Sequence, residues 1–260
     1  MAAIYATPKT GVVITGGASG IGLATARALA EIGRAVALWD INGDKAASEA
    51  KAIADEFGVK AIGVRTDLAD PQAPGPAAIK TREAIGAIGG LLYAAGNVEA
   101  TGIEGVNPDN WDRGLNIHLR GLVLTTQALL PDFKANRGSA IVAIASIQGT
   151  LGNGSIPIYT AAKGGILSLI RSMADELANY GVRANSISPG FIETPMLLGS
   201  IPEQIQDAMK EMWVKRVLLR RLGKPEEIAN VARFLLTDEA SLITAQEIVV
   251  DNASYPTQDI

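Results

Sequence analysis

Residues 11–22 read GVVITGGASGIG, an apolar run that leads into a glycine-rich turn, and the helix-forming residues LATARALAEIG follow at 23–33. An unbroken run of apolar, β-branched residues indicates a strand that is buried on both faces. Glycines at the turn allow a tight bend and let backbone amides approach a pyrophosphate, while the start of a helix attracts negative charge. Glycines also mark ordinary strand–helix corners, but the position of this turn after a first strand predicts a dinucleotide site.

The same pattern of strand and helix repeats along the chain. Apolar runs occur at 11–15, 34–40, 60–65, 91–95, 139–145, 182–188 and 246–251. Amphipathic segments of helical length lie between them, near 20–33, 43–57, 74–87, 109–136, 158–180 and 225–236. This alternation predicts an α/β fold, a Rossmann-type doubly wound parallel sheet of about seven strands with helices on both faces. A length of 260 residues suits a single domain, residues 1–260.

One region breaks this rhythm. Residues 189–223 (PGFIETPMLLGSIPEQIQDAMKEMWVKRVLLRRLG) form a long connection that is rich in Met, Leu and Trp. Long connections are usually functional or disordered. The apolar composition favours a folded substrate-binding lid over an apolar site.

Composition excludes several classes of function. A net charge of −4 gives no basic field that would attract nucleic acid or anionic lipid. The chain has no cysteine and a single histidine, which leaves little for a metal site. No signal peptide is visible, and no apolar segment reaches the roughly 20 residues that span a bilayer. We therefore expect a cytoplasmic protein that acts on a small molecule and binds no nucleic acid, membrane or metal.

Asp40 ends the second predicted strand, eighteen residues after Gly22. An acid at this place can accept hydrogen bonds from the adenosine ribose hydroxyls and would repel a 2′-phosphate. An aspartate that caps a turn or helix is also common after a strand, and that alternative stays open. Because residues 16–22 and 39–43 contain no Lys or Arg, we expect NAD rather than NADP as the cofactor.

Tyr159 and Lys163 lie four residues apart at the start of a predicted helix, so their side chains share one face. A free tyrosine has a pKa of about 10, and a nearby cation favours the phenolate. Ser146 follows an apolar strand, at the edge where ligands bind in open α/β sheets, and can hold a substrate oxygen. Singly, the three residues have ordinary explanations as a cap, a packed aromatic and a solvated cation. Together, downstream of a dinucleotide turn, they predict acid–base catalysis coupled to hydride transfer.

These motifs resemble the short-chain dehydrogenase/reductase family, in its compact single-domain branch. The resemblance covers nearly the whole chain: TGGASGIG at 15–22, Asp67-Leu68, AAG at 94–96, Ser146 with Tyr159 and Lys163, PGFIET at 189–194, and GKPEEIANVARFLLTDEASLITAQEIVVD at 223–251. The Ser–Tyr spacing of thirteen and the Tyr–Lys spacing of four match the family pattern. The resemblance implies an NAD-dependent alcohol dehydrogenase or ketone reductase that acts on a secondary hydroxyl or its ketone.

The resemblance also implies where a cofactor is held. The expected cofactor-binding residues are Gly16, Ser19, Gly20, Ile21, Gly22, Asp40, Ile41, Asp67, Leu68, Ala94, Gly96, Tyr159, Lys163, Pro189, Ile192 and Thr194. Among these, Asp67 and Leu68 should flank the adenine, and Lys163 should hold the nicotinamide ribose. Because the family is mostly tetrameric through its long helices, near 109–136 and 158–180, we expect a homotetramer.

Two positions depart from the family pattern. Tyr93-Ala94-Ala95-Gly96 stands where the family usually has Asn-Asn-Ala-Gly, so cofactor contacts there must come from the backbone. His118 falls where the family has an active-site asparagine that supports a helix kink, whose carbonyl holds a water leading protons from the lysine to solvent. A histidine could preserve the kink and carry protons itself, or it could simply pack there, and both alternatives stay open. Asn116 should not substitute, because two residues turn a helix by roughly 200°.

The expected substrate pocket is mostly apolar and carries two amides. Its predicted wall consists of Ile147, Gln148, Asn153, Phe191, Met196, Leu197, Met212 and Trp213. Such a wall suits an uncharged or weakly polar secondary alcohol or ketone, cyclic or aromatic. Lys210, Lys215 and Arg216 could face a carboxylate, but long cationic side chains usually stay in water, so sugars and hydroxy acids are not favoured.

Other classes of function are weaker alternatives. A nucleotide sensor or scaffold that kept the fold and lost the chemistry would explain the changes at Tyr93 and His118, but the complete set of Ser146, Tyr159 and Lys163 argues against it. Within related folds, enoyl reductases usually show a wider Tyr–Lys spacing, and epimerases of this kind are longer.

Overall fold

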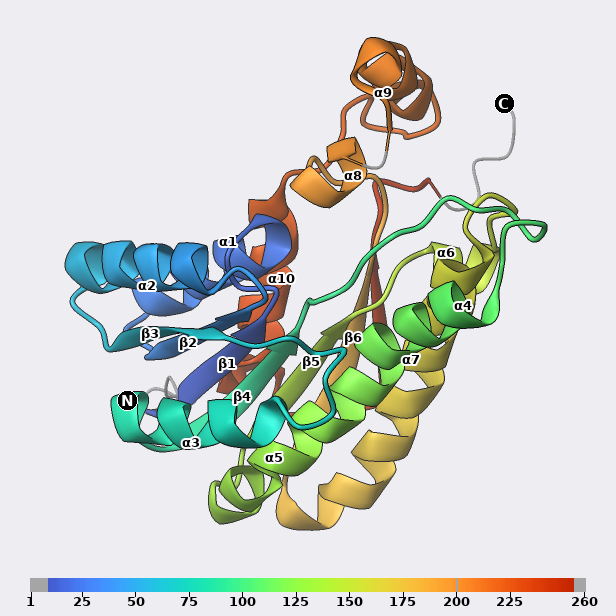
Figure 1. Cartoon of the computed structure of the whole chain (residues 1–260). Coiled ribbons are helices and arrows are strands. Elements are labelled where there is room, and N and C mark those ends of the chain that lie inside the picture. The colour runs from blue at the N-terminus through green and yellow to red at the C-terminus, as the bar shows by residue number, and fades with distance from the viewer. Residues whose placement is uncertain (1–8, 200, 255–260) are drawn as a thin grey trace.

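Each apolar run of the sequence forms a strand of one parallel sheet (Figure 1). The computed structural model describes residues 9–199 and 201–254. Within them the strands are β1 (Gly11–Thr15), β2 (Val36–Asp40), β3 (Ala61–Arg65), β4 (Ile88–Tyr93), β5 (Ala140–Ile144), β6 (Arg183–Pro189) and β7 (Glu247–Val250). Their order in the sheet is β3-β2-β1-β4-β5-β6-β7, and each neighbouring pair is parallel. The predicted doubly wound sheet is confirmed.

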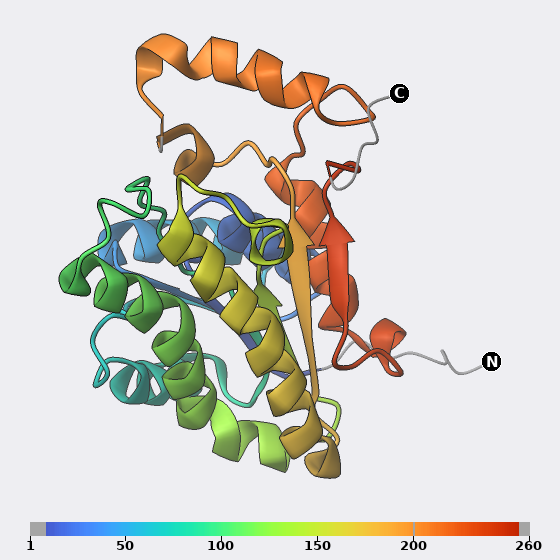
Figure 2. The same ribbon diagram turned by 90° about the vertical axis from the view of Figure 1, so that its right-hand side faces the viewer.

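Helices cover both faces of the sheet, as Figures 1 and 2 show. One face is covered by α1 (Gly20–Glu31), α2 (Gly43–Phe57) and α10 (Pro225–Leu235), and the other by α3 (Pro74–Ile85), α5 (Gly121–Ala135) and α7 (Pro157–Leu177). Neighbouring residues of a strand point to opposite faces. Val12 and Ile14 therefore pack under α1, α2 and α10, whereas Val13 packs under the other three helices. This double burial explains why the strand sequences are apolar without alternation.

Strand order reverses beside β1, because β2 and β3 lie on one side of it and β4 to β7 on the other. At such a reversal the connections leave the sheet toward opposite faces, and a crevice opens at the carboxyl ends of the strands. The turn after β1 and the segment after β4 border this crevice. The topology therefore places the glycine-rich turn where ligands bind in open α/β sheets.

The long connection between β6 and α10 folds into an arm above the carboxyl ends of the strands (Figure 2). It contains α8 (Pro195–Gly199), a 3₁₀ turn η3 (Glu203–Ile205) and α9 (Gln206–Lys215). At the base of the arm, Ile192 and Gly223 form a parallel bridge. The Gly223 amide donates to the Phe191 carbonyl at 2.9 Å, and the Glu193 amide donates to the Gly223 carbonyl at 2.8 Å. The two ends of the arm are thus tied together.

The helix predicted near 109–136 is interrupted. It consists of α4 (Pro108–Leu115), a single π turn η1 (Asn116–Arg120) and α5. A π turn accommodates one extra residue and is frequent at functional sites. His118 lies in the middle of this turn. Two shorter turns, η2 (Ala178–Tyr180) and η4 (Asp238–Ala240), and the short helix α6 (Gln148–Leu151) complete the elements of the described residues.

Candidate functional site

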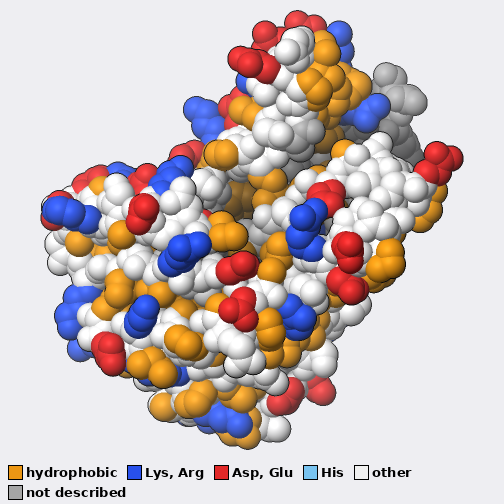
Figure 3. Space-filling view, in the orientation of Figure 1, with side chains coloured by type: hydrophobic (Ala, Val, Ile, Leu, Met, Phe, Trp, Pro, Cys, Tyr) orange, Lys and Arg blue, Asp and Glu red, His pale blue; other side chains and the backbone are white. Residues whose placement is uncertain are grey.

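A cleft of about 670 Å³ runs along the carboxyl ends of the strands and beneath the arm. Figure 3 shows it as a hollow between the arm and the body of the molecule, with hydrophobic side chains in its depth. Its volume lies within the range of small-molecule and cofactor sites. Within residues 9–199 and 201–254, we find no group of three or more His, Asp or Glu side chains that could hold a metal ion. In the same residues, each helix is too short or too polar to cross a bilayer.

The turn after β1 has the geometry of a phosphate cradle. Gly16 and Gly20 adopt φ angles of 63° and 51°, which favour glycine. Gly22 in the first turn of α1 packs so closely that a β-carbon there would overlap the Gly16 carbonyl. Ser19 is the N-cap of α1, and its side chain makes no capping hydrogen bond to the helix. The first amides of α1 lack partners within the helix, so the turn fits a pyrophosphate.

We expect Gly22→Ala to weaken nicotinamide binding by at least about tenfold, because the new methyl group must displace the backbone that forms the cradle. Titration of the reduced cofactor by its fluorescence measures this effect. Gly75→Ala is the matched control, since nothing lies within 4 Å of a β-carbon at that position on α3. Equal affinity in the Gly22→Ala and Gly75→Ala proteins would remove the turn from the binding site.

Asp40 lies at the tip of β2 and lines the cleft. One carboxylate oxygen accepts a hydrogen bond from the Ala18 amide at 3.0 Å, and the other accepts from the Asn42 amide at 2.9 Å. Asp40 therefore has the turn-capping role that the sequence left open, and it also braces the glycine-rich turn. These contacts leave lone pairs on both oxygens that can accept further hydrogen bonds.

The structure brings the remaining predicted cofactor residues to the same cleft. The wall includes Gly16, Ser19, Gly20, Ile21, Gly22, Ile41, Asp67, Leu68, Ala94, Gly96, Pro189, Ile192 and Thr194. Sequence reasoning missed Thr15, whose hydroxyl accepts hydrogen bonds from the amides of Ala94 and Ala95 at 3.1 and 3.2 Å. Thr15 ties the end of β1 to the segment after β4. Its position directly before the glycines was the available signal.

Ser146, Tyr159 and Lys163 also line the cleft. They lie on the side of β5, which β4 separates from β1 and its glycine-rich turn. Ser146 follows β5, and its hydroxyl accepts from the Gln148 amide at 3.2 Å and pairs with the Tyr159 hydroxyl. Tyr159 and Lys163 lie on the first turns of α7. The Lys163 Nζ is 5.3 Å from the centre of the Tyr159 ring and donates to the Ile144 carbonyl at 2.7 Å. The helical spacing thus predicted their proximity correctly.

The electrostatics of this group differ from the expectation. The sequence predicted a phenol made acidic by Lys163 together with an oxidised nicotinamide. Among the protein's own groups, burial raises the pKa of Tyr159, and the hydrogen bond with Ser146 opposes this only partly. Burial also lowers the pKa of Lys163 to about 7. Both shifts have the same cause, since a buried site disfavours whichever form is charged. The protein groups alone therefore keep the phenol protonated, ready to donate a proton.

The arrangement can support proton transfer at a substrate oxygen. A bound nicotinamide would supply or accept the hydride, and its positive charge when oxidised would favour the phenolate. The hydroxyl of Tyr159 can give a proton to a carbonyl oxygen or take one from an alcohol, and Ser146 can hydrogen-bond the same oxygen. Lys163, when protonated, would stabilise negative charge on the phenolate.

His118 lies behind Tyr159 rather than in the main cleft. Its side chain is 1% exposed, and its ring meets the Tyr159 ring edge-on, with the ring centres 5.6 Å apart. It borders a separate small cavity of about 10 Å³. Burial and the charge of Lys163 lower the pKa of His118 to about 3. This shift favours the neutral imidazole at neutral pH.

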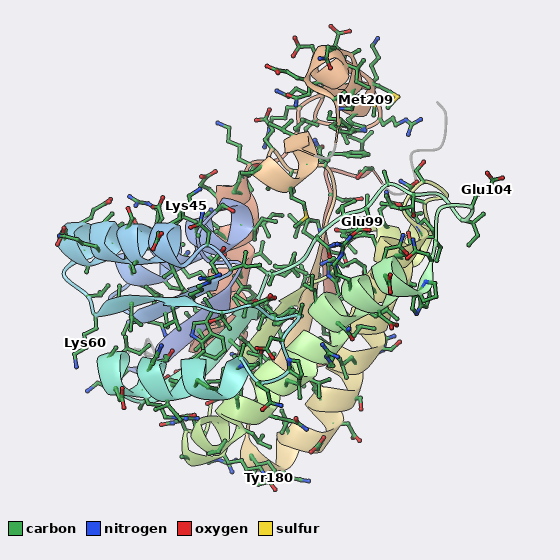
Figure 4. The ribbon with its side chains drawn as sticks, in the orientation of Figure 1. Lys45, Lys60, Glu99, Glu104, Tyr180 and Met209 are labelled. Atoms are coloured by element: carbon green, nitrogen blue, oxygen red, sulfur yellow. The ribbon has the colours of Figure 1, made fainter. Side chains whose placement is uncertain are left out.

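Most of the predicted substrate wall lies where it was expected. The cleft is lined by Ile147, Gln148, Asn153, Phe191, Met196, Leu197 and Trp213. Trp213 is buried, and its ring stacks on Phe191 with the centres 5.3 Å apart, which fixes α9 to the base of the arm. The prediction that Met212 lines the pocket is wrong, because its side chain is exposed. Met209, one turn earlier on α9, lines the cleft instead. Figure 4 shows Met209 on this helix of the arm.

Other lining residues were also missed. They include Asn97, Val98 and Ala100 after β4, Ile117 in the π turn, and Ile201 in the arm. The first three follow the carboxyl end of a buried strand, which is a signal that could have found them. Lys210, Lys215 and Arg216 do not line the cleft, and Lys215 and Arg216 are exposed, in keeping with their expected solvation.

Comparison with known proteins places this site in a family. A family model described as enoyl-(acyl carrier protein) reductase matches residues 16–252. Acetoacetyl-CoA reductase of Synechocystis sp. is 34% identical over 246 residues, which cover 95% of this chain and 96% of the relative. Cyclohexanol dehydrogenase of Acinetobacter sp. is 36% identical over 248 residues, which cover 93% of each chain.

Solved structures give the same result. L-sorbose reductase from Gluconobacter frateurii, complexed with NADPH and L-sorbose, superposes with a TM-score of 0.91 at 26% identity. The match covers 97% of this chain and 99% of that chain. The chain therefore belongs to the short-chain dehydrogenase/reductase family of oxidoreductases, which bind a nicotinamide cofactor.

Proposed function

We propose that this oxidoreductase uses NAD(H) to interconvert a secondary alcohol and its ketone, with Ser146, Tyr159 and Lys163 as catalytic residues. The observation that carries the proposal is that these three side chains line the same cleft as the glycine-rich turn. We further propose that residues 1–260 act as one catalytic domain, in which 189–223 form the substrate lid. A homotetrameric assembly and a cytoplasmic location stay predictions.

Asp40 is the argument for NAD. Its carboxylate lines the cleft at the end of β2, where it can accept hydrogen bonds from ribose hydroxyls and would repel a 2′-phosphate. The glycine-rich turn contains no cation that would compensate for that repulsion. L-sorbose reductase, with the same fold, is complexed with NADPH, so the fold alone does not decide the cofactor.

Asp40→Ala should lower the ratio of kcat/KM for NAD to that for NADP by at least about tenfold, because it removes both the ribose acceptor and the repelling charge. Steady-state kinetics with each cofactor measure the ratio. Asp44→Ala removes the same charge from an exposed position four residues away and serves as the control. A ratio that does not change in Asp40→Ala would show that the carboxylate only braces the turn.

The walls of the cleft favour an apolar substrate. Phe191, Met196, Met209 and Trp213 gather on the side of the arm, and Gln148 and Asn153 supply amides on the other side. An apolar ring with one hydroxyl or carbonyl suits this mixture. The name of the relative from Acinetobacter, cyclohexanol dehydrogenase, agrees with such a substrate.

A substrate panel tests the proposal. We expect purified protein to change the absorbance of the nicotinamide with cyclohexanol and NAD, or with cyclohexanone and NADH, faster than with L-sorbose or acetoacetyl-CoA. An enoyl thioester in the panel tests the chemistry named in the description of the family model. Turnover of the enoyl thioester alone would contradict the proposal. Nicotinamide binding without turnover across the panel would instead favour the sensor or scaffold.

A further inference from the structure

We propose that Tyr93 and His118 act together as positioning residues, which hold the π turn Asn116–Arg120 against the segment after β4 and thereby fix the ring of Tyr159. The consequence for catalysis rests on the proposed role of Tyr159. Neither side chain lines the main cleft, so neither is expected to touch the substrate.

Tyr93 supports the π turn from the sheet. It is the last residue of β4 and is 1% exposed, and its hydroxyl donates to the Ile117 carbonyl at 2.5 Å. Burial raises the pKa of Tyr93, so this hydroxyl stays protonated and remains a donor. The turn is closed by the Gly121 amide, which donates to the Asn116 carbonyl five residues earlier. A β-carbon at Gly121 would collide with the Tyr93 hydroxyl, so the glycine provides the space for this contact.

His118 is the next residue of the π turn after Ile117, and its side chain reaches the segment after β4. Its Nε2 lies 3.0 Å from the Asn97 carbonyl oxygen and 3.3 Å from the Asn97 amide nitrogen. A β-carbon at Gly96 would collide with the imidazole, so the ring fits against the backbone only because residue 96 is glycine. The ring also meets Tyr159 edge-on, at an interplanar angle of 85°. His118 thus contacts both the 96–97 backbone and the proposed proton donor.

The two contacts form one continuous support. Tyr93 fixes the Ile117 carbonyl, the next residue is His118, and the His118 ring contacts Tyr159. A shift of the π turn would therefore move the imidazole and release the phenol. In catalysis, a misplacement of about 1 Å can cost about 10²-fold in rate. Because the imidazole lies outside the main cleft and contacts both the Asn97 backbone and the Tyr159 ring, we assign it to positioning rather than to proton transfer.

The single histidine of the chain allows a direct test, independent of substrate. In tag-free protein labelled with ¹⁵N-histidine, we expect one pair of imidazole resonances, from a neutral ring that does not titrate between about pH 5 and pH 8. Tyr93→Phe, which removes only the hydroxyl, should shift these resonances. Titration of the ring within this range, or resonances that Tyr93→Phe leaves unchanged, would overturn the proposal.

Kinetics test the consequence for catalysis. With the panel alcohol that the parent turns over fastest, Tyr93→Phe and His118→Phe should each lower kcat by about tenfold, with little change in KM or in the midpoint of the pH profile. The double variant should be no slower than the slower single variant, because both changes break one support. Tyr180→Phe is the control, since Tyr180 is exposed and lies at the far end of the molecule (Figure 4).

The outcomes separate this inference from the proposed function. A shifted pH midpoint in His118→Phe would assign proton transfer to the imidazole and overturn the positioning role. If kcat per folded molecule is unchanged in Tyr93→Phe and His118→Phe, both residues only pack in the interior and the positioning role is wrong. If the parent turns over no alcohol, or if Tyr159→Phe stays fully active, the proposed function fails instead. The resonances of His118 still decide whether Tyr93 positions the imidazole.

Discussion

Tyr159→Phe is expected to lower kcat by about 10²–10⁴-fold, the usual contribution of a positioned acid or base. The substitution removes one oxygen and keeps the ring, so its edge-on contact with His118 and the packing of α7 are retained. Nicotinamide binding should therefore persist while turnover is lost. Single-turnover kinetics, together with a fluorescence titration of the cofactor, separate the two quantities.

Thr160→Val is the matched control for this prediction. It also removes a hydroxyl from the first turn of α7, but the Thr160 oxygen is a buried atom without a hydrogen-bond partner in the described part of the chain. We expect near-parental turnover in Thr160→Val. Comparable losses in both variants would attribute the effect of Tyr159→Phe to disturbance of the helix and would remove the tyrosine from the chemistry.

The fold could be predicted because its signals are local. Each strand is buried on both faces, which leaves an unbroken apolar run, and each helix repeats its apolar positions at the helical period. The proximity of Tyr159 and Lys163 was predictable for the same reason, since helical geometry converts a spacing of four residues into a shared face. Ser146 and Asp40 were found because parallel strands bring their carboxyl ends to one edge.

The parts that sequence did not predict depend on burial and on three-dimensional packing. The spacing of Tyr159 and Lys163 suggested a cation beside a phenol, but it carried no measure of desolvation, which dominates both pKa shifts. The wrong prediction of Met212 in place of Met209 has a similar origin. Helix α9 carries apolar residues on more than one face, and only its packing against Phe191 selects the face that meets the cleft.

The π turn illustrates the same limit. A kink was expected near His118 from the resemblance alone, but the contact between the Tyr93 hydroxyl and the Ile117 carbonyl joins residues 24 positions apart. Neither the residue types nor their spacing in the sequence predicts such a contact. The two departures from the family pattern, Tyr93 and His118, looked like separate losses in the sequence, whereas in the fold they support the same turn.

Lys163→Met is expected to lower turnover by at least about 10²-fold and yet to raise the Tm of the cofactor-free protein. Lys163 is 4% exposed, and burial lowers its pKa from 10.5 to about 7. The unfolded chain therefore binds the proton more tightly than the folded chain. The parent loses stability as the pH falls from about 10.5 to about 7, and the loss stays constant below about pH 7.

Methionine has no such titration, so the excess stability of Lys163→Met over the parent should grow as the pH is lowered through this interval and then level off. The lost hydrogen bond to the Ile144 carbonyl reduces the gain. Differential scanning calorimetry across the interval measures the difference. Lys60→Met is the matched control, because it makes the same substitution at an exposed position (Figure 4). A Tm difference between Lys163→Met and the parent that is independent of pH would mean that the buried lysine keeps its ordinary pKa, and the electrostatic account of this site would be wrong.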